Sequence, residues 1–251
     1  MTIPKIIHQI WIQGYQSIPT RLKRYHEECK EINNNYEHMF WNEEKIIDLL
    51  RNYFGEKFVE TYSTFTVFAQ KADFARYAIL YVYGGIYLDM DMICKKNLDP
   101  FLNYKLFCTT DALHFFYKRY LNGIIGAVPN HSVFLYAFKN IFERLHYRNN
   151  VTYSTGTKLF YDSVMEYINM NKTNDVAIID KKYLHPCGPY DDEDCPNSCD
   201  SCFVAHTNYG SWYPTFFKYF YKYFKIKYLY VILLIIFILL IFYTGKASGC
   251  S

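Results

Sequence analysis

Two carboxylates stand two residues apart at the end of an apolar segment, in the sequence IYLDMDM at residues 86–92. If this segment is a strand, its period of two places Tyr87, Asp89 and Asp91 on one face. Paired carboxylates bind Mg²⁺ or Mn²⁺ together with substrate phosphates, and the ion neutralises charge on a leaving diphosphate. The pattern therefore predicts a divalent-cation site, with a solvated strand end as the alternative, because such pairs also arise by chance.

A second charged pair precedes the carboxylates. Residues 66–83 carry apolar side chains at spacings of three and four, which predicts a helix, and Gly84 with Gly85 would end it. Asp73 and Arg76 are three residues apart and share one face of that helix. They are either a surface ion pair of small energetic value or part of the same site as the two aspartates.

The elements that must position these residues alternate along the chain. Strands are expected at residues 5–12, 36–41 and 86–92, and helices at residues 19–32, 42–55 and 66–83, with Asn42 as a candidate N-cap. Such alternation indicates an α/β layered domain. We expect one domain over residues 1–214, because no linker or repeat divides it, although residues 97–129 carry no recognisable motif.

Three blocks of the chain resemble a known enzyme family. The run KADFARYAILYVYGGIYLDMDM at residues 71–92 resembles the sugar-binding Asp-x-Asp region of certain glycosyltransferases. They are related to the yeast initiating α-1,6-mannosyltransferase, the inositol-phosphoceramide mannosyltransferases and bacterial capsular sugar transferases. IPKIIHQIWIQG at residues 3–14 is similar to the family's first strand, and HTNYGSWYP at residues 206–214 to its closing segment. The resemblance implies a GT-A fold, a Rossmann-like nucleotide-sugar-binding domain. It also implies transfer of a hexose from a nucleoside diphosphate sugar, with retention of configuration.

The resemblance also implies a nucleotide-sugar pocket. Its residues would be Trp11, Asp73, Arg76, Tyr87, Asp89, Ser211 and Trp212. Trp11 would lie near the nucleobase, where an indole face can stack, although a core tryptophan is the alternative. Asp73 and Arg76 would hold donor hydroxyls and phosphate or sugar oxygens, a task that suits a planar guanidinium. Ser211 and Trp212 would close over the diphosphate.

The implied metal ligands are Asp91, which binds the ion directly, Asp89, which meets the sugar and a metal-bound water, and His206. The cofactor would be Mn²⁺ or Mg²⁺. Catalysis would rest on Asp89, Asp91 and Arg76, because charge stabilisation of the departing diphosphate needs no proton transfer. We assign no general base.

One segment has no counterpart in the family pattern and contains four closely spaced cysteines, Cys187, Cys195, Cys199 and Cys202. In a cytosolic domain thiolates are kept reduced, which favours a structural Zn²⁺ bound by all four. Disulfides and incidental cysteines are the alternatives, because the spacing is not that of a standard zinc ribbon.

The C-terminal region contains a run without charges, YLYVILLIIFILLIFY at residues 228–243. A helix over residues 228–245 would be about 27 Å long, close to the thickness of the hydrocarbon layer, and a buried core helix is the alternative. We therefore expect an aromatic and basic juxtamembrane segment at residues 215–227, a single membrane span at residues 228–245 and a short tail at residues 246–251. The lysines before the span outnumber the one after it, which favours a catalytic domain on the cytosolic face. They are Lys218, Lys222, Lys225 and Lys227 against Lys246.

Composition limits the class of partner. The net charge is only +3, and much of the excess lies near the C-terminus, so nucleic acid is not an expected partner. The expected partners are a UDP- or GDP-linked sugar, a glycan or glycolipid acceptor and a membrane. Two rival readings remain: an inactive membrane-tethered binding or scaffold module, and a phosphatase of the haloacid-dehalogenase type with Asp89 as nucleophile and Asp91 as acid/base.

Overall fold

The structure is a computed structural model that describes residues 1–110, 119–188, 194–209, 228 and 230–238. Two compact units are distinguished, Met1–Tyr209 and Gly210–Ser251. The strands described are β1 (Ile6–Ile10), β2 (Glu37–Trp41), β3 (Gly85–Leu88), β4 (Met92–Cys94), β5 (Leu106–Thr109), β6 (Leu121–Ala127), β7 (Val176–Ile179) and β8 (Val204–His206). The α-helices described are α1 (Thr20–Ile32), α2 (Glu43–Phe54), α3 (Glu56–Ser63), α4 (Phe68–Tyr83), α5 (Val133–Glu143), α6 (Val151–Ser154), α7 (Thr157–Asn171) and α8 (Lys181–Leu184).

A mixed six-stranded sheet forms the centre of the first unit, with the strand order β2-β1-β3-β6-β5-β7. Strand β1 pairs in parallel with β2 and β3, whereas β6 runs antiparallel to β3 and β5. A separate two-stranded antiparallel sheet joins β4 to β8. The carboxyl ends of β1 and β3 therefore meet at one edge of the large sheet, where ligands of open α/β sheets bind.

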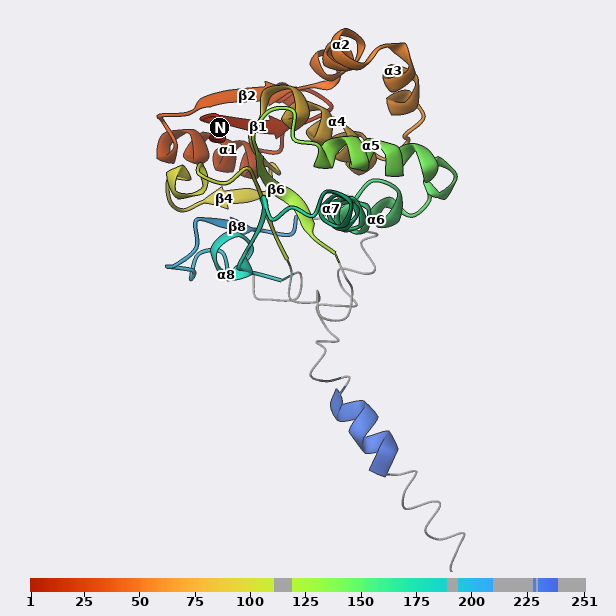
Figure 1. The fold of residues 1–251 in the computed structure, drawn as a ribbon. Helices are drawn as coiled ribbons and strands as arrows, with labels where there is room; N and C mark the ends of the chain where they lie inside the picture. Colours follow the sequence, from red (N-terminus) through yellow and green to blue (C-terminus); the bar gives the residue numbers. More distant parts are fainter. Residues whose placement is uncertain (111–118, 189–193, 210–227, 229, 239–251) are drawn as a thin grey trace, which may run out of the picture. The chain divides into compact units, whose positions relative to one another are not determined.

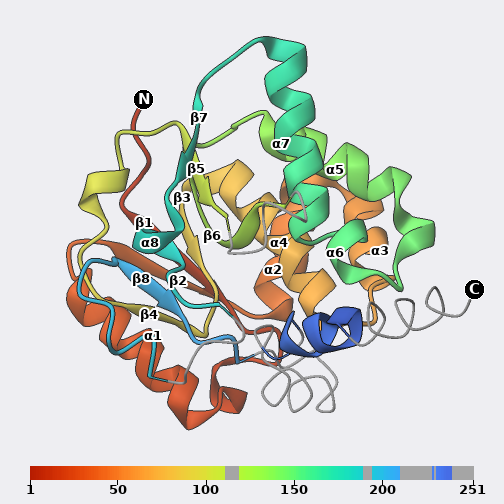
Figure 2. The same ribbon diagram turned by 90° about the horizontal axis from the view of Figure 1, so that it is seen from below.

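Each face of the large sheet has its own core. Tyr87 and Ile125 belong to a cluster with helices α2, α4, α5 and α7, whereas their neighbours Ile86 and Ile124 pack with α1, β4 and β8. This alternation is the period of two expected for strands buried on both faces. Figures 1 and 2 show the resulting layers, with the sheet between α4, α5 and α7 on one side and α1, β4 and β8 on the other. The expected α/β architecture is confirmed.

Local sequence accounts for several element boundaries. The Asn42 side chain accepts a hydrogen bond from the Lys45 backbone N–H at 3.1 Å, so it caps α2 as expected. Helix α4 ends at Tyr83 and is followed by Gly84 and Gly85, whose φ angles are +64° and +90°. A Cβ on Gly85 would lie 2.7 Å from the Ile6 carbonyl oxygen, so only glycine lets β3 approach β1 this closely.

His8 supports the same glycine turn. Its Nε2 lies 2.8 Å from the Gly84 carbonyl oxygen, and its Nδ1 accepts a hydrogen bond from the Trp41 indole at 3.2 Å. Burial lowers the pKa of His8 to about 4, so the ring is neutral and donates from Nε2. This histidine, for which the sequence offers no role, ties β1 and β2 to the end of α4.

The predicted strand over residues 86–92 is wrong in one respect, because the chain turns within it. Strand β3 ends at Leu88, the Met92 backbone N–H bonds to the Asp89 carbonyl oxygen at 3.1 Å, and the chain continues as β4. Strand β4 pairs with β8 rather than with the large sheet. The alternating pattern cannot reveal this turn, because both strands are apolar and a tertiary partner, β8, draws the chain away.

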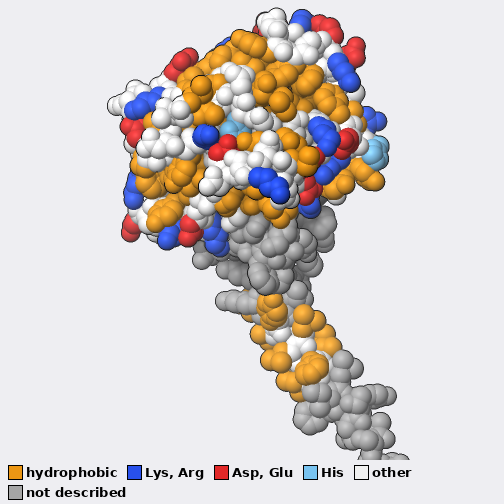
Figure 3. All heavy atoms as spheres, viewed as in Figure 1, with side chains coloured by type: hydrophobic (Ala, Val, Ile, Leu, Met, Phe, Trp, Pro, Cys, Tyr) orange, Lys and Arg blue, Asp and Glu red, His pale blue; other side chains and the backbone are white. Residues whose placement is uncertain are grey.

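The second unit is described at residue 228 and over residues 230–238, which are helical. The large side chains of Val231 to Ile238 are 40–60% exposed, and Figure 3 shows the hydrophobic surface that they form. Within the residues described, no helix combines the length and the apolar character needed to cross a membrane. Residues 229 and 239–245 of the predicted span lie outside the described residues.

Candidate active site

The two aspartates lie where β3 leaves the large sheet. The Asp89 backbone N–H donates to the Gly123 carbonyl oxygen at 2.8 Å, the last link between this strand and β6. Asp91 follows in the turn and precedes β4, while His206 is the last residue of β8. Because Met92 pairs with His206 in the small sheet, the histidine is brought beside the aspartates across a sequence separation of more than a hundred residues.

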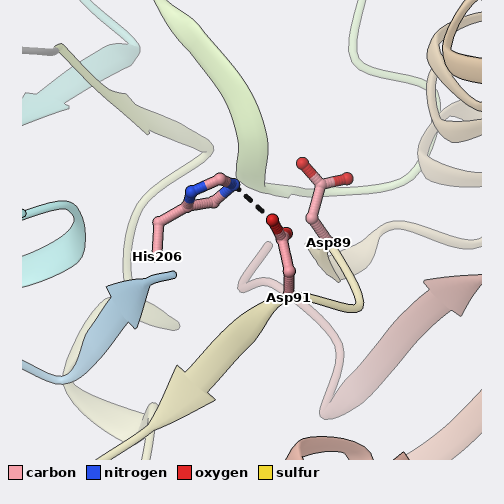
Figure 4. A group of neighbouring side chains, drawn as sticks. All are labelled: Asp89, Asp91 and His206. Carbon is pink, nitrogen blue, oxygen red and sulfur yellow. Dashed lines mark ion pairs between the residues drawn. The ribbon is translucent and has the colours of Figure 1, made fainter. Parts of the chain in front are cut away.

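Figure 4 shows the three side chains converging. One ligand atom from each of Asp89, Asp91 and His206 lies within 4.8 Å of the others. The His206 Nε2 is 3.2 Å from the Asp91 Oδ1, and the three side chains remain partly accessible, at 27%, 15% and 17% for Asp89, Asp91 and His206. Two carboxylates and an imidazole around an accessible point fit a divalent cation such as Mn²⁺ or Mg²⁺.

The protonation states of Asp91 and His206 depend on each other. Burial opposes the charge on both groups, but their mutual attraction outweighs it, lowering the pKa of Asp91 and raising that of His206 to about 9. The Tyr209 backbone N–H, 3.0 Å from the Asp91 Oδ2, further stabilises the carboxylate. A cation bound to the His206 Nε2 would replace the proton on that nitrogen, so cation binding and proton release are coupled.

Arg76 joins Asp73 to Asp89, two carboxylates that are sixteen residues apart in the sequence. Its Nη2 lies 3.2 Å from Asp73 Oδ1 and 3.2 Å from Asp89 Oδ1. Its guanidinium lies over the Tyr87 ring at 4.5 Å, and the Tyr87 hydroxyl donates to Asp89 Oδ1 at 2.7 Å. Tyr87 is 1% exposed, so in this structure it supports Asp89 and presents no open ring face.

Asp73 is buried beside Arg76. Its Oδ1 accepts from the Asn122 amide at 2.8 Å and its Oδ2 from the Thr155 hydroxyl at 2.9 Å. Burial raises the pKa of Asp73 to about 6, against the opposing effects of Arg76 and these hydrogen bonds. The carboxylate is therefore charged at neutral pH and fixes the Arg76 fork. The alternative of a surface ion pair is wrong, because both side chains are buried.

Two site residues lie in the segment that carries no recognisable motif. The Asn122 carbonyl oxygen accepts from Arg76 Nη1 at 2.6 Å. A Cβ on Gly123 would lie 2.5 Å from Asp89 Oδ2, so glycine leaves room for the carboxylate. The signal in the sequence is a polar residue followed by glycine inside the apolar run LNGIIGA, since glycine in a strand often marks a close approach.

Trp11 directly follows β1 at the edge that carries Asp89. It packs against the small cluster that contains Met90, the residue between the two aspartates, and its indole N–H donates to the Ser17 hydroxyl at 3.0 Å. It is only partly buried, so the alternative of a core tryptophan is not supported. Ser211 and Trp212 lie outside the described residues.

The predicted site for Zn²⁺ is corrected by the structure. Cys187 and Cys195 form a disulfide, and two bonded sulfurs cannot both act as thiolate ligands. Cys199 and Cys202 are free thiols, of which Cys202 is buried. A second disulfide, Cys29–Cys94, joins α1 to β4; a separation of 65 residues leaves no local signal for this pairing.

Comparison with known proteins identifies the family. The glycosyltransferase sugar-binding region containing a DXD motif matches residues 19–108. An uncharacterized glycosyltransferase of Acanthamoeba polyphaga mimivirus is 55% identical over 212 residues, which cover 84% of each chain. A mannosyl phosphorylinositol ceramide synthase of Saccharomyces cerevisiae is 32% identical over 140 residues, 55% of this chain and 35% of the yeast protein. The chain thus matches well under half of the yeast relative's length.

Solved structures share the fold. The PaToxG glycosyltransferase aligns with a TM-score of 0.56 and 18% identity over 67% of this chain and 70% of its own. The ligand-free glycosyltransferase domain of the YGT toxin aligns with a TM-score of 0.58 and 8% identity over 71% and 80%. At such identities the likeness concerns the fold alone, a mixed-sheet α/β fold of the GT-A type. With the sequence matches, it shows that this chain belongs to the glycosyltransferases whose sugar-binding region contains a DXD motif.

Proposed function

We propose that this chain is a metal-dependent hexosyltransferase that uses a nucleoside diphosphate sugar and retains anomeric configuration. The observation that carries the proposal is the cluster of Asp89, Asp91 and His206 beside the buried Arg76, at the carboxyl edge of parallel strands. An accessible cation site next to a fixed guanidinium is what a departing diphosphate requires. A phosphatase of the haloacid-dehalogenase type would not explain Arg76 or the family match.

Each residue has a defined task in this proposal. Asp91 and His206 would hold Mn²⁺ or Mg²⁺, and Asp89 would contact the sugar and complete the cation's surroundings. When bound, the ion supplies positive charge that neutralises the diphosphate. Arg76, held by Asp73, keeps its guanidinium aimed at the same point before the donor arrives, so little reorganisation is needed during transfer. Trp11, beside Met90, would stack on the nucleobase, and Ser211 and Trp212 would close over the donor.

The relatives suggest the donor and the acceptor. Proteins named mannosyl phosphorylinositol ceramide synthase and inositol phosphoceramide mannosyltransferase are among the matches, which favours mannose and a lipid-linked acceptor. A membrane anchor at residues 228–245 would bring the enzyme to such an acceptor, and the exposed apolar side chains of residues 230–238 support it. A membrane-associated glycan is compatible with the same arrangement.

Two features of the chain favour opposite sides of the membrane for the first unit. The lysines before the apolar run favour the cytosolic face, but two disulfides favour an oxidising compartment. We give the disulfides more weight, because they persist only where thiols are not kept reduced, whereas the lysine rule is statistical. We therefore revise the cytosolic placement and propose that the first unit faces an oxidising compartment.

The test is release of nucleoside diphosphate from a panel of UDP- and GDP-hexoses by the chain of residues 1–251 in detergent, with and without Mn²⁺. We expect Mn²⁺-dependent hydrolysis of one donor, which would identify the sugar and the nucleobase together. Nucleotide binding without release, with or without lipid and glycan acceptors, would instead support an inactive binding module. Equal release with and without the ion would contradict the cation assignment.

A further inference from the structure

Helix α4 presents a buried polar face to the segment before α7. Gln70, Asp73 and Tyr77, at spacings of three and four, lie on this face and are at most 5% exposed. Gln70 donates to the Ser154 hydroxyl at 3.0 Å, and Tyr77 donates to the Thr155 carbonyl oxygen at 2.9 Å. Hydrogen bonds thus fix residues 154 and 155 against the helix that carries Arg76.

One of these contacts leads directly to the site. The Thr155 side chain is buried, and its oxygen lies 2.9 Å from Asp73 Oδ2 and 3.3 Å from the Val151 carbonyl oxygen. A hydroxyl has a single proton, and the shorter bond to a charged carboxylate is the stronger one. Thr155 therefore donates to Asp73. Asp73 in turn forms an ion pair with Arg76, and Arg76 forms a second ion pair with Asp89.

Gly156, the residue after Thr155, lies close to the Asp73 carboxylate that Thr155 contacts. Gly156 begins the turn into α7, and a Cβ there would lie 3.1 Å from the Thr152 Cα and 3.4 Å from Asp73 Oδ2. The same carboxylate is held on its other oxygen by the Asn122 amide at 2.8 Å. Asp73 is thus held by two segments that are distant in sequence, β6 and Thr155 between α6 and α7.

We propose that Thr155 is a positioning residue for sugar transfer, which acts through Asp73 to aim the Arg76 guanidinium at the diphosphate beside Asp89. This inference rests on the proposed function. Without the hydroxyl, Asp73 Oδ2 loses a buried donor and the carboxylate is less firmly held, so one of the contacts that orient Arg76 is weakened. The nucleotide contacts assigned to Trp11 are untouched, so the loss falls on turnover more than on nucleotide binding.

The test compares three variants of the chain of residues 1–251. Thr155→Val removes the hydroxyl at nearly constant volume, Thr155→Ser keeps it, and Ser154→Ala is the matched control. Ser154→Ala removes a neighbouring buried hydroxyl whose partner, Gln70, has no contact with Arg76 among the bonds described. The readouts are kcat and KM for Mn²⁺-dependent release of nucleoside diphosphate, the Kd of the free nucleoside diphosphate with Mn²⁺, and the thermal midpoint.

We expect kcat of Thr155→Val to fall by about 10- to 100-fold, as for residues that orient a ligand from behind. Thr155→Ser and Ser154→Ala should stay within about threefold of the wild type, and the Kd of the nucleotide for Thr155→Val should rise by a smaller factor than kcat falls. A Thr155→Val enzyme with unchanged kcat, or a Ser154→Ala enzyme that loses as much, would overturn the inference. A wild type that releases no nucleotide from any donor would instead refute the proposed function, and the inference with it.

Discussion

The site has two sides that are built differently. The arginine side consists of Asp73, Arg76, Tyr87 and Asp89, where two carboxylates share one guanidinium among buried hydrogen bonds. The histidine side consists of Asp91 and His206, held together by the small sheet of β4 and β8. Arg76 keeps its charge at every relevant pH, whereas His206 can exchange its proton for a cation.

This difference separates two tasks. On the arginine side both carboxylates pair with a guanidinium of the protein itself, so the geometry is set before any ligand binds. The histidine side changes its charge when a cation replaces the His206 proton. We therefore expect changes on the histidine side to alter the dependence on metal, and changes on the arginine side to alter turnover at saturating metal.

The largest effect is expected for Asp91→Asn. The amide keeps the shape of the side chain but loses the charge that attracts both His206 and a cation. Mn²⁺-dependent release of nucleoside diphosphate should fall by about 100-fold or more, while the circular dichroism spectrum is retained. Asp48→Asn, at an exposed position on α2, is the matched control and should behave as the wild type. Wild-type activity of Asp91→Asn would place the cation elsewhere.

Gly123→Ala tests the arginine side. The new Cβ would meet the far end of the Asp89 side chain, which can move at little cost to the fold but loses its contacts with Arg76 and Tyr87. We expect kcat to fall by about 10- to 100-fold, and the Mn²⁺ concentration that gives half-maximal activity to rise by a smaller factor, because Asp91 and His206 still hold the ion. If the variant instead needs much more Mn²⁺, the two sides are not separate.

The pH dependence of the arginine side follows from Asp73. With a folded pKa of about 6, Asp73 gains a proton below this pH and releases Arg76, so kcat should fall by about tenfold per pH unit at lower pH.

The free energy of unfolding should change with pH in the opposite direction. Because the folded pKa lies above the unfolded one, the stabilising contribution is full below about pH 4 and is lost as the pH rises through 6. Profiles of kcat and of the thermal midpoint over pH 4.5–8 measure the two trends. A thermal midpoint that rises between pH 4.5 and 6 in the wild type, but not in Asp73→Asn, would contradict the raised pKa of Asp73.

The smallest effect is expected at the disulfide next to the histidine side. The Cys187 carbonyl oxygen accepts from the Asn208 amide at 3.4 Å, and Asn208 holds the His206 Nδ1. Replacing Cys187 and Cys195 together by Ser should raise the Mn²⁺ requirement by about threefold, less than removal of a direct partner of a ligand. Peptide mapping without reductant should find both disulfides in the wild type, and metal analysis that finds zinc bound at these cysteines would restore the Zn²⁺ hypothesis.

Much of the fold could be predicted from local pattern. The α/β alternation, the Asn42 cap and the helix that ends at Gly84 are encoded within a few residues, and the structure confirms them. Asp73, Arg76, Asp89 and Asp91 lie within one stretch of nineteen residues, which suggested a common site but left open whether Asp73 and Arg76 belong to it. The resemblance to a family added His206, which no local pattern connects to the aspartates.

Tertiary structure decided what depends on distant pairing. The turn that begins at Asp89, after β3, requires β8 as a partner for β4, and the two hydrogen bonds to Asp73 require Asn122 and Thr155 from separate segments. The pairing of Cys187 with Cys195 required the folded loop, because several pairings of the cysteines suit the same spacing. The sequence by itself thus determined which chemical groups are present and which local elements carry them. Their partners were decided by long-range packing, because hydrogen bonds between distant segments leave no period in the chain.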